Sequence, residues 1–460
     1  AHHDDMLYLG KDPQPSWSYP PLAEGGYADR ARYDYWSRKD PIATYAAKLQ
    51  SEGIVDEDEV ERWKAEIEEL VEEQARAVID APWPDAALAG EGVLADEPRR
   101  VRVEVLEHRR GAQCAPLTIE DAPPFDAKGK TFLEAVMLGV GDALRRDPRV
   151  FVYGEDVGGK YGNAFLLLRP LLNEFGDRIL NSVLSEGSTI GVCVGAALAG
   201  LRPIGEIQFN DFVATGFNQL VNNAAKLRYR WGALAREGGI GVPMVLRMPW
   251  GGLRHAGPYH SQNTEAWFYR VPGLKIVAPS TPHDARALMA AAVDDPDPVL
   301  YYEHIGLYRD PRVKQLIGDD APAPLPIGKA ALRRAGSDLA IVSYGAYVHV
   351  AMRVAEALAK DGVESAVLDL RTLAPLDRDI ILDVARHCSR VLVVHEDTRT
   401  GSIGESIAAI IQEEAFEYLD APVRVVGALD TPVPYSPPLE EEFLPSERDI
   451  ERAARLLLAW

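Results

Sequence analysis

The chain has 460 residues, of which 47% are hydrophobic and 26% charged, with a formal net charge of −21. This length predicts about three domains. The negative net charge argues against nucleic acid or an anionic membrane as a partner. It favours basic protein partners, although a negative charge also keeps a protein soluble. No apolar run is long enough to span a membrane. The sequence has three widely separated cysteines, Cys114, Cys193 and Cys388, which match neither a disulfide framework nor a zinc site. This use of cysteine predicts a reducing, cytoplasmic compartment.

The N-terminal part, residues 1–85, is expected to contain a loop followed by helices. Residues 1–40 are rich in Pro, Gly, Tyr and Asp and predict an extended ordered loop. Asp40-Pro41 predicts the start of a helix, because proline suits a first helical turn. A second helix should follow Asp56. Its apolar residues recur at three- and four-residue steps: Val60, Trp63, Ile67, Leu70, Val71 and Val78. Residues 86–127 predict a linker with one short strand.

From residue 128 the pattern becomes strands alternating with helices, which predicts a doubly wound parallel sheet. Thr131 and Glu134 form a capping box at the start of the first helix. The expected strands are 150–153, 180–184, 203–209, 243–247 and 275–278, and a helix should begin at Pro282. A break near residues 315–330 separates a second α/β unit. We expect a sheet domain over residues 128–320 and a second α/β domain over residues 335–460.

A lone carboxylate follows one of these strands, in Leu184-Ser185-Glu186-Gly187. Taken alone, such an acid could simply cap the next helix. However, Gln208 lies at the end of the next strand and Phe212 follows it, and ligands of doubly wound sheets bind where strands end. A carboxyl group beside an aromatic ring suits the aminopyrimidine of thiamine diphosphate, whose ring nitrogen must gain a proton. The pattern therefore predicts a pyrimidine site.

His260 lies in Gly257-Pro258-Tyr259-His260-Ser261-Gln262, a loop that follows the strand 243–247. A lone histidine is more often structural or exposed than catalytic. Here the loop should reach the ligand edge of the sheet, where an imidazole could stabilise a substrate carbonyl or assist acyl transfer. His255 is the alternative.

The sequence lacks the motif that would hold the cofactor's diphosphate. No Gly-Asp-Gly exists in the chain, so Asn222-Asn223 is not the second half of a magnesium motif. No Gly-x-Gly-x-x-Gly follows a strand either, which argues against a nicotinamide or flavin site.

Residues 128–460 resemble a complete β subunit of the thiamine-dependent 2-oxo acid dehydrogenases. The matching segments are Gly154-Glu155-Asp156-Val157, Leu184-Ser185-Glu186-Gly187, Glu206-Ile207-Gln208-Phe209, Asp211-Phe212, Ala224-Ala225-Lys226, Ala256-Gly257-Pro258-Tyr259-His260-Ser261-Gln262, Val271-Pro272-Gly273-Leu274-Lys275 and Pro279-Ser280. The resemblance implies a thiamine-type pyrimidine-binding domain followed by a transketolase C-terminal-like domain. It further implies that Glu186 is the partner of the pyrimidine nitrogen, that Leu184, Gln208 and Phe212 line the pocket, and that His260 is the active-site histidine. Phe212 departs from the tyrosine of the branched-chain members.

Residues 1–85 resemble the C-terminal end of the α subunit of the same enzymes, through His2-His3-Asp4-Asp5, residues 35–42 and the acidic helix ending at Pro82. In that family a histidine of this loop reaches the cofactor diphosphate, and we assign it to His3 rather than His2. The loop lacks its usual serines. Since Ala1 is preceded by no initiator context, we expect the chain to be the C-terminal piece of a fused α–β polypeptide, with the magnesium ligands on the missing α-type part.

The resemblance implies the decarboxylating component of a 2-oxo acid dehydrogenase complex, acting on a branched-chain 2-oxo acid or pyruvate and reductively acylating a lipoyl group. The implied cofactors are thiamine diphosphate and Mg²⁺. The implied partners are an α-type diphosphate-binding part, a second copy of this chain in a heterotetramer, and the subunit-binding and lipoyl domains of a dihydrolipoyl acyltransferase core. Together with the resemblance, acids of the C-terminal unit predict the docking surface: Glu405, Glu413, Glu414, Glu417, Asp420, Glu440, Glu441 and Glu442. On the helix expected from about Gly404 to Tyr418, Glu413 and Glu417 are four residues apart and share a face. The alternative is an ordinary solvated helix face. The alternatives are an acetoin dehydrogenase component, a transketolase-like enzyme, or a non-catalytic docking scaffold.

Overall fold

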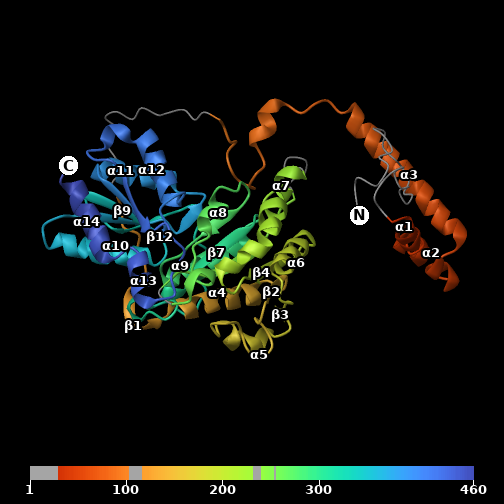
Figure 1. Ribbon diagram of the computed structural model, residues 1–460, viewed down its shortest axis with the longest axis horizontal. Helices are drawn as coiled ribbons and strands as arrows, with labels where there is room; N and C mark the ends of the chain where they lie inside the picture. The colour runs from red at the N-terminus through yellow and green to blue at the C-terminus, as the bar shows by residue number, and fades with distance from the viewer. Residues whose placement is uncertain (1–28, 103–116, 232–239, 253–254) are drawn as a thin grey trace. The chain divides into compact units, whose positions relative to one another are not determined.

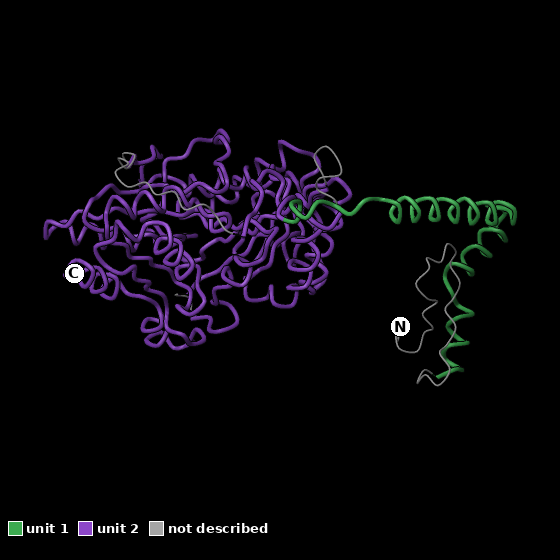
Figure 2. Tube along the Cα trace, turned by 90° about the horizontal axis from the view of Figure 1, so that it is seen from above, with its two compact units in different colours: residues 1–89 green, residues 90–460 purple. Residues whose placement is uncertain are grey.

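The computed structural model describes residues 29–102, 117–231, 240–252 and 255–460. The chain forms two compact units, residues 1–89 and residues 90–460, which Figure 2 colours separately. His2 and His3, the strand expected near residues 101–105, and Cys114 fall wholly or partly outside the described residues. Among the described residues, no helix combines the length and apolar character needed to cross a membrane.

The described part of unit 1 contains three α-helices, α1 (Arg30–Ser37), α2 (Pro41–Ser51) and α3 (Glu57–Asp80). The helices predicted after Asp40 and Asp56 are confirmed, with Asp40 capping α2 and Asp56 forming a capping box with Glu59. The prediction of a loop throughout residues 1–40 is wrong for residues 30–37, which form α1. The Asp29 side chain accepts a hydrogen bond from the Arg32 backbone N–H (2.8 Å) and so caps the start of this helix. In the described part of this unit, no side chain of the three helices is buried.

Unit 2 begins with a seven-stranded sheet in the order β11-β6-β7-β5-β4-β2-β3. Figure 1 labels four of its strands, β7, β4, β2 and β3. Its strands are β2 (Val150–Gly154), β3 (Ile179–Asn181), β4 (Arg202–Glu206), β5 (Val245–Trp250), β6 (Lys275–Val277), β7 (Val299–His304) and β11 (Thr372–Ala374). All pairs are parallel except β11 with β6. The strand predicted to reach Leu184 ends at Asn181, so residues 182–185 form a loop that leads into the next helix.

Helices cover both faces of this sheet, as predicted for a doubly wound fold. On one face α4 (Phe132–Arg146) and α9 (Pro282–Asp294) pack with Val245, and on the other α6 (Glu186–Leu198) packs with Leu246. Neighbouring residues of a strand point to opposite faces, which explains this division. The predicted capping box of Thr131 and Glu134 starts α4.

The second sheet has the order β13-β12-β9-β10-β8. Its strands are β8 (Ala331–Arg334), β9 (Leu339–Ser343), β10 (Ser365–Asp369), β12 (Val391–Thr398) and β13 (Arg424–Ala428). Only β8 is antiparallel to its neighbour. Helices α10 (Tyr347–Ala359) and α14 (Glu447–Leu458) cover one face, and α11 (Arg378–Cys388) and α12 (Ile403–Glu414) the other. This is the second α/β domain that the sequence predicted, hereafter the C-terminal domain.

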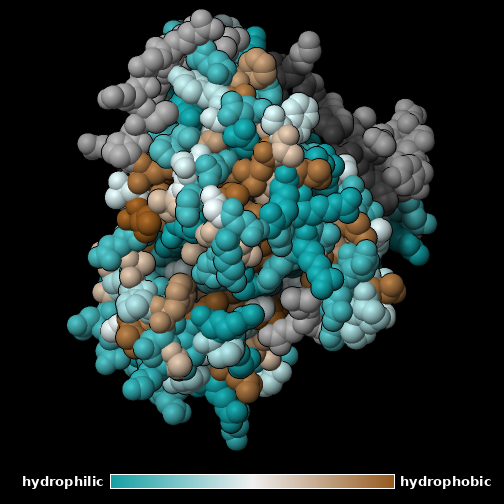
Figure 3. All heavy atoms as spheres, turned by 90° about the vertical axis from the view of Figure 1, so that its left-hand side faces the viewer, coloured by the Kyte–Doolittle hydropathy of each residue, from teal (hydrophilic) through white to brown (hydrophobic). Residues whose placement is uncertain are grey.

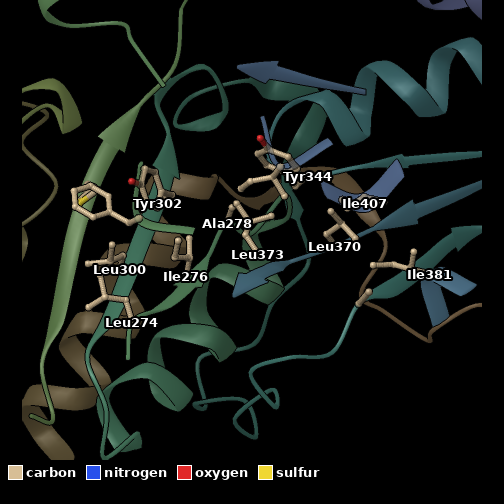
Figure 4. Packing of buried hydrophobic residues seen from close by; sticks show 14 of the residues in the cluster. Leu274, Ile276, Ala278, Leu300, Tyr302, Tyr344, Leu370, Leu373, Ile381 and Ile407 are labelled. Carbon is tan, nitrogen blue, oxygen red and sulfur yellow. The ribbon is translucent and has the colours of Figure 1, made fainter. Parts of the chain in front are cut away.

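The two sheets share one hydrophobic core. Strand β11 pairs with β6 of the first sheet although it follows β10 of the second. Figure 4 shows Leu274, Ile276 and Leu300 in the same cluster as Leu370, Leu373 and Ile381. The C-terminal domain therefore packs firmly against the domain that carries the predicted site, while the predicted boundaries at residues 320 and 335 remain a proposal.

Candidate active site

Glu186 is the first residue of α6, but it does not cap the helix. The cap is Ser185, whose hydroxyl accepts the backbone N–H of Ser188 (3.4 Å). The Glu186 carboxylate instead accepts a hydrogen bond from the hydroxyl of Thr215 (2.6 Å). The helix therefore leaves the Glu186 carboxyl group available for another partner.

Glu155, just after β2, joins the predicted site residues to one another. Its carboxylate accepts the Ser185 N–H (2.9 Å), and its main-chain oxygen accepts a hydrogen bond from the Gln208 side chain (3.1 Å). Burial and then the nearby Glu186 carboxylate raise the pKa of Glu155. Two carboxyl groups thus lie close together where the parallel strands end, which is where such sheets bind ligands.

An aromatic cluster forms the other side of the site. The His260 ring lies edge-on against Phe209 (centroids 4.8 Å apart) and Phe212 (5.2 Å). The alternative, His255, lies elsewhere: its Nδ1 is 2.7 Å from a carboxylate oxygen of Glu440. Of the two histidines, His260 is the one that contacts Phe212.

The His260 loop is fastened to the segment between Gln208 and Phe212. Gln262 donates its backbone N–H to Asp211 (3.0 Å), and its carbonyl oxygen accepts from the Asn210 side chain (2.7 Å). The Thr264 hydroxyl donates to Asn210 (2.6 Å). Burial raises the pKa of Asp211 to about 6, although hydrogen bonds from backbone N–H groups oppose this shift.

Behind the site a buried ion cluster joins the carboxyl ends of three strands. Arg247 on β5 pairs with Glu206 on β4 and with Glu303 on β7 (2.7 Å to Nε). The Tyr308 hydroxyl donates to Glu303 (2.6 Å). All these groups are buried, so each depends on its partners. The cluster holds these strand ends in register beneath the site.

One side of the site exposes apolar side chains to solvent. Leu184 is 87% exposed and Val183 70% exposed. The surface of α6 at Gly195 is also open, because a Cβ added there would meet nothing within 4 Å. A carboxylate, an aromatic ring and uncovered apolar side chains fit the flat, proton-accepting pyrimidine end of thiamine diphosphate, provided that another surface covers Leu184. The described residues contain no group of three or more His, Cys, Asp or Glu side chains that could hold a metal ion.

Two residues of this site were not predicted. In the sequence, Glu155 stands out only within the segment Gly154-Glu155-Asp156-Val157 of the resemblance. Thr215 is marked only by lying three residues after Phe212; in the structure it belongs to the short helix η4 (Asn210–Gly216). Both become evident only when the ends of β2 and β4 and the start of α6 come together.

The prediction that the acids of the C-terminal unit form a docking surface is partly wrong. Glu440 is completely buried, Glu414 is bound to Arg378, and α12 ends at Glu414, so Glu413 and Glu417 do not share one α-helical face. Glu413, Glu417, Glu441 and Glu442 are exposed.

Family models match three parts of the chain. Residues 26–87 match the Dehydrogenase E1 component, residues 128–311 the pyrimidine binding domain of transketolase, and residues 328–450 the transketolase C-terminal domain. Among solved structures, a split-gene transketolase described as an inactive β4 tetramer aligns with a TM-score of 0.58 at 20% identity, over 72% of this chain and 99% of the other. That structure supports the fold alone.

Characterised relatives match at higher identity. The 2-oxoisovalerate dehydrogenase subunit beta of Bacillus subtilis is 44% identical over 332 residues, 71% of this chain and 98% of the relative. The pyruvate dehydrogenase E1 component subunit beta of Rickettsia felis is 37% identical over 71% of this chain and 97% of the relative. An acetoin:2,6-dichlorophenolindophenol oxidoreductase subunit beta of Cupriavidus necator is 38% identical over 70% and 95%. This chain therefore belongs to the family of the β subunits of 2-oxo acid dehydrogenases, and it carries a Dehydrogenase E1 component segment ahead of its β-type part.

Proposed function

We propose that this chain supplies the pyrimidine half of the active site of a 2-oxo acid dehydrogenase's decarboxylating component. The observation that carries the proposal is the carboxyl group of Glu186. It lies where the strands of a parallel sheet end, it does not cap its own helix, and it is bonded to Thr215 beside exposed apolar residues. The family relationship gives the reaction class.

Thiamine diphosphate, when bound, supplies a thiazolium carbon that adds to the carbonyl group of a 2-oxo acid and accepts the electron pair released with carbon dioxide. Glu186 would hold a proton at the pyrimidine ring nitrogen. Gln208 and Leu184 would line the pyrimidine pocket, and Phe212 would offer it a ring face. The cluster of Arg247, Glu206 and Glu303 would keep this wall rigid, since positioned groups react faster than mobile ones.

His260 would act on the substrate rather than on the pyrimidine. Its ring edge-on against Phe209 and Phe212 restricts its orientation. A fixed imidazole N–H can stabilise charge on a substrate oxygen or donate a proton during acyl transfer. His3, from the N-terminal segment, remains a candidate contact to the diphosphate.

The substrate class is a 2-oxo acid, with a branched-chain 2-oxo acid or pyruvate as the two candidates, since relatives of both names match over nearly their whole length. An acetoin dehydrogenase component is the second candidate function, and the relative from Cupriavidus necator favours it. A docking scaffold without catalysis is disfavoured because Glu186 and its bond to Thr215 are intact.

The partners that complete the site would be an α-type part, which brings the diphosphate and magnesium ligands, and a second copy of this chain. The exposed Val183 and Leu184 support a covering partner, because apolar side chains at a binding site are normally shielded from water. The acyltransferase core would dock on the C-terminal domain. Figure 3 views the molecule from the side on which Figure 1 labels α10 and α14 of this domain, and hydrophilic side chains surround small separate hydrophobic patches there. Cys193 and Cys388 are free and buried, which supports a reducing cytoplasmic location.

The test is turnover by the chain assembled with its α-type part, thiamine diphosphate and Mg²⁺, using an artificial electron acceptor. Pyruvate, 2-oxoisovalerate and acetoin are compared as substrates. We expect one of the two 2-oxo acids to give the highest kcat/KM. Preference for acetoin would select the second candidate, and turnover of none of them by an assembly that binds the cofactor would contradict the proposal.

A further inference from the structure

The residues around His260 adopt a strained backbone. His255 has φ of +53° and Gly257 φ of +70°, both in the left-handed region. A non-glycine residue there costs energy and persists only where its surroundings impose it. We call residues 255–262 the histidine segment. The groups that impose its conformation belong mainly to the C-terminal domain.

Glu440 holds the first residue of the histidine segment. It lies in α13 (Pro437–Phe443), and its side chain is completely buried. Its carboxylate accepts the backbone N–H of His255 (3.2 Å) and lies 2.7 Å from Nδ1 of the same residue. A buried carboxylate is stable only when it is hydrogen-bonded, so Glu440 fixes both the backbone and the ring of His255.

Tyr435 and Val433 hold the middle and the end of the segment. A Cβ added at Gly257 would lie 2.3 Å from the Tyr435 ring, so that ring packs directly on the Gly257 backbone. The backbone N–H of Val433 donates to the Gln262 side chain (3.1 Å). Since Asp211 accepts the Gln262 backbone N–H, Gln262 is held from both domains at once.

The strand that precedes the histidine segment is anchored in the same way. Glu396 of β12 accepts the backbone N–H of Gly252 (2.6 Å), and its other oxygen lies 2.6 Å from Nε2 of His304. Both side chains are buried. The C-terminal domain therefore holds the chain on both sides of His260.

We propose that the C-terminal domain completes the active site as a positioning element, with Glu440 and Tyr435 as positioning residues for His260. Neither residue contacts the substrate in this account. Their contribution is to keep the His260 ring against Phe209 and Phe212, where it faces the reacting groups. This inference rests on the proposed role of His260.

The first test is independent of catalysis. The full chain is labelled with ¹³C at its 10 histidines, and the His260 signal is assigned with His260→Gln. Because that ring lies against two phenylalanines, its ring-proton shifts should carry ring-current displacements. Glu440→Ala should move the signal toward the value of a free histidine. Glu440→Gln, which keeps an acceptor for both His255 groups, should leave it nearly unchanged. Glu356→Ala, at an exposed glutamate of α10, is the matched control and should change nothing.

The second test is turnover of the same variants in the assembled enzyme. Glu440→Ala should lower kcat by about tenfold or more, since small displacements of a catalytic group are costly, while the Kd for thiamine diphosphate stays within about twofold. Glu440→Gln should restore most of the rate. An unmoved His260 signal, or a moved signal with normal turnover, would overturn the proposal.

If Glu440→Ala does not fold, Tyr435→Leu tests the same point, because it removes the packing on Gly257 and leaves the hydrogen bond of Glu440 with the His255 backbone in place. It should displace the His260 signal and lower kcat. Should His260→Ala itself retain full turnover, the proposed role of His260 would fail, and the chemical-shift test would still report whether the C-terminal domain positions the segment.

Discussion

Thr215 controls the environment of Glu186 at the residue scale. Its hydroxyl has one proton and two acceptors within reach, Glu186 Oε2 (2.6 Å) and the carbonyl oxygen of Phe212 (3.0 Å). With Glu186 ionised, the hydroxyl can donate to the carboxylate. With Glu186 protonated, it can accept from the carboxyl group and donate to Phe212. A threonine therefore suits the role proposed for Glu186, in which the carboxyl group exchanges a proton with the pyrimidine.

Thr215→Val should lower kcat/KM by about tenfold, since a hydrogen bond to a charged group contributes on the order of 1.5–3 kcal/mol and 1.4 kcal/mol is tenfold in rate. Thr215→Ser keeps the hydroxyl and should retain most of the activity. Turnover and thiamine diphosphate affinity of both variants check this in the assembled enzyme. Equal activity of the valine and serine variants would show that the hydroxyl has no role.

Asp211 should make stability depend on pH. Its pKa rises from an ordinary value of 3.8 to about 6 in the folded chain. A raised carboxyl pKa means that the folded state holds a proton that the unfolded state has released, so its stabilising contribution is lost as pH rises from about 4 through 6. Asp211→Asn should remove this part of the decline, because the amide does not titrate.

Urea unfolding of the chain and of Asp211→Asn between about pH 4 and 7 measures the difference. The wild-type free energy of unfolding should fall more steeply with pH than that of the variant. Parallel curves would mean that Asp211 titrates alike in the folded and unfolded chains.

The sequence indicated which residues could carry the chemistry, but not which groups hold them. Gln208 lies at the end of a predicted strand, and Glu186, Phe212 and His260 each follow one. The structure brings their segments to one edge. His255 and His260 could not be separated by sequence, since the choice depends on Glu440, which is 185 residues away along the chain.

Among the helices and strands, features fixed by a few neighbouring residues could be predicted from the sequence. Features that depend on contacts between distant parts of the chain could not. The predicted capping box of α4 depends on four consecutive residues and is confirmed. The helix predicted after Asp56 is confirmed as α3. Strand β11 has three residues and forms only against β6, about a hundred positions earlier, so no local pattern reveals it. The predicted helix through residue 418 fails because the backbone leaves the helical region at Ala415 (φ −133°).

The arrangement of α12 and α13 also bears on which acids can form the predicted docking surface for the acyltransferase. Since Glu440 is buried, the exposed acids Glu413 and Glu417 are the better candidates for capture of a basic acyltransferase domain. Reversing both to lysine should slow association at low salt, because opposite charges chiefly steer encounters. Stopped-flow association rates test this, with decarboxylation by the artificial-acceptor assay unchanged. The same association rate as the wild type at low salt would place the docking surface elsewhere.

The whole molecule combines an E1-type segment with a β-type part, and the sequence has no Gly-Asp-Gly to hold a diphosphate. We therefore expect the chain by itself not to bind thiamine diphosphate at micromolar concentration, because the charged end of the cofactor supplies much of its anchoring. Calorimetry with the chain alone and with an added α-type part checks this. Micromolar, magnesium-dependent binding by the chain alone would contradict the expectation.

The central claim is that Glu186 provides the proton that the pyrimidine nitrogen needs. Glu186→Gln matches the carboxyl group in size and can still accept a hydrogen bond from Thr215, but it cannot supply that proton. Turnover of this variant in the assembled enzyme, with thiamine diphosphate, Mg²⁺ and an artificial electron acceptor, is the most direct measurement. The account predicts a fold that is intact by thermal unfolding and a rate below about a tenth of wild type, a barrier increase of at least roughly 1.4 kcal/mol. A variant that keeps more than about a tenth of the rate would contradict it.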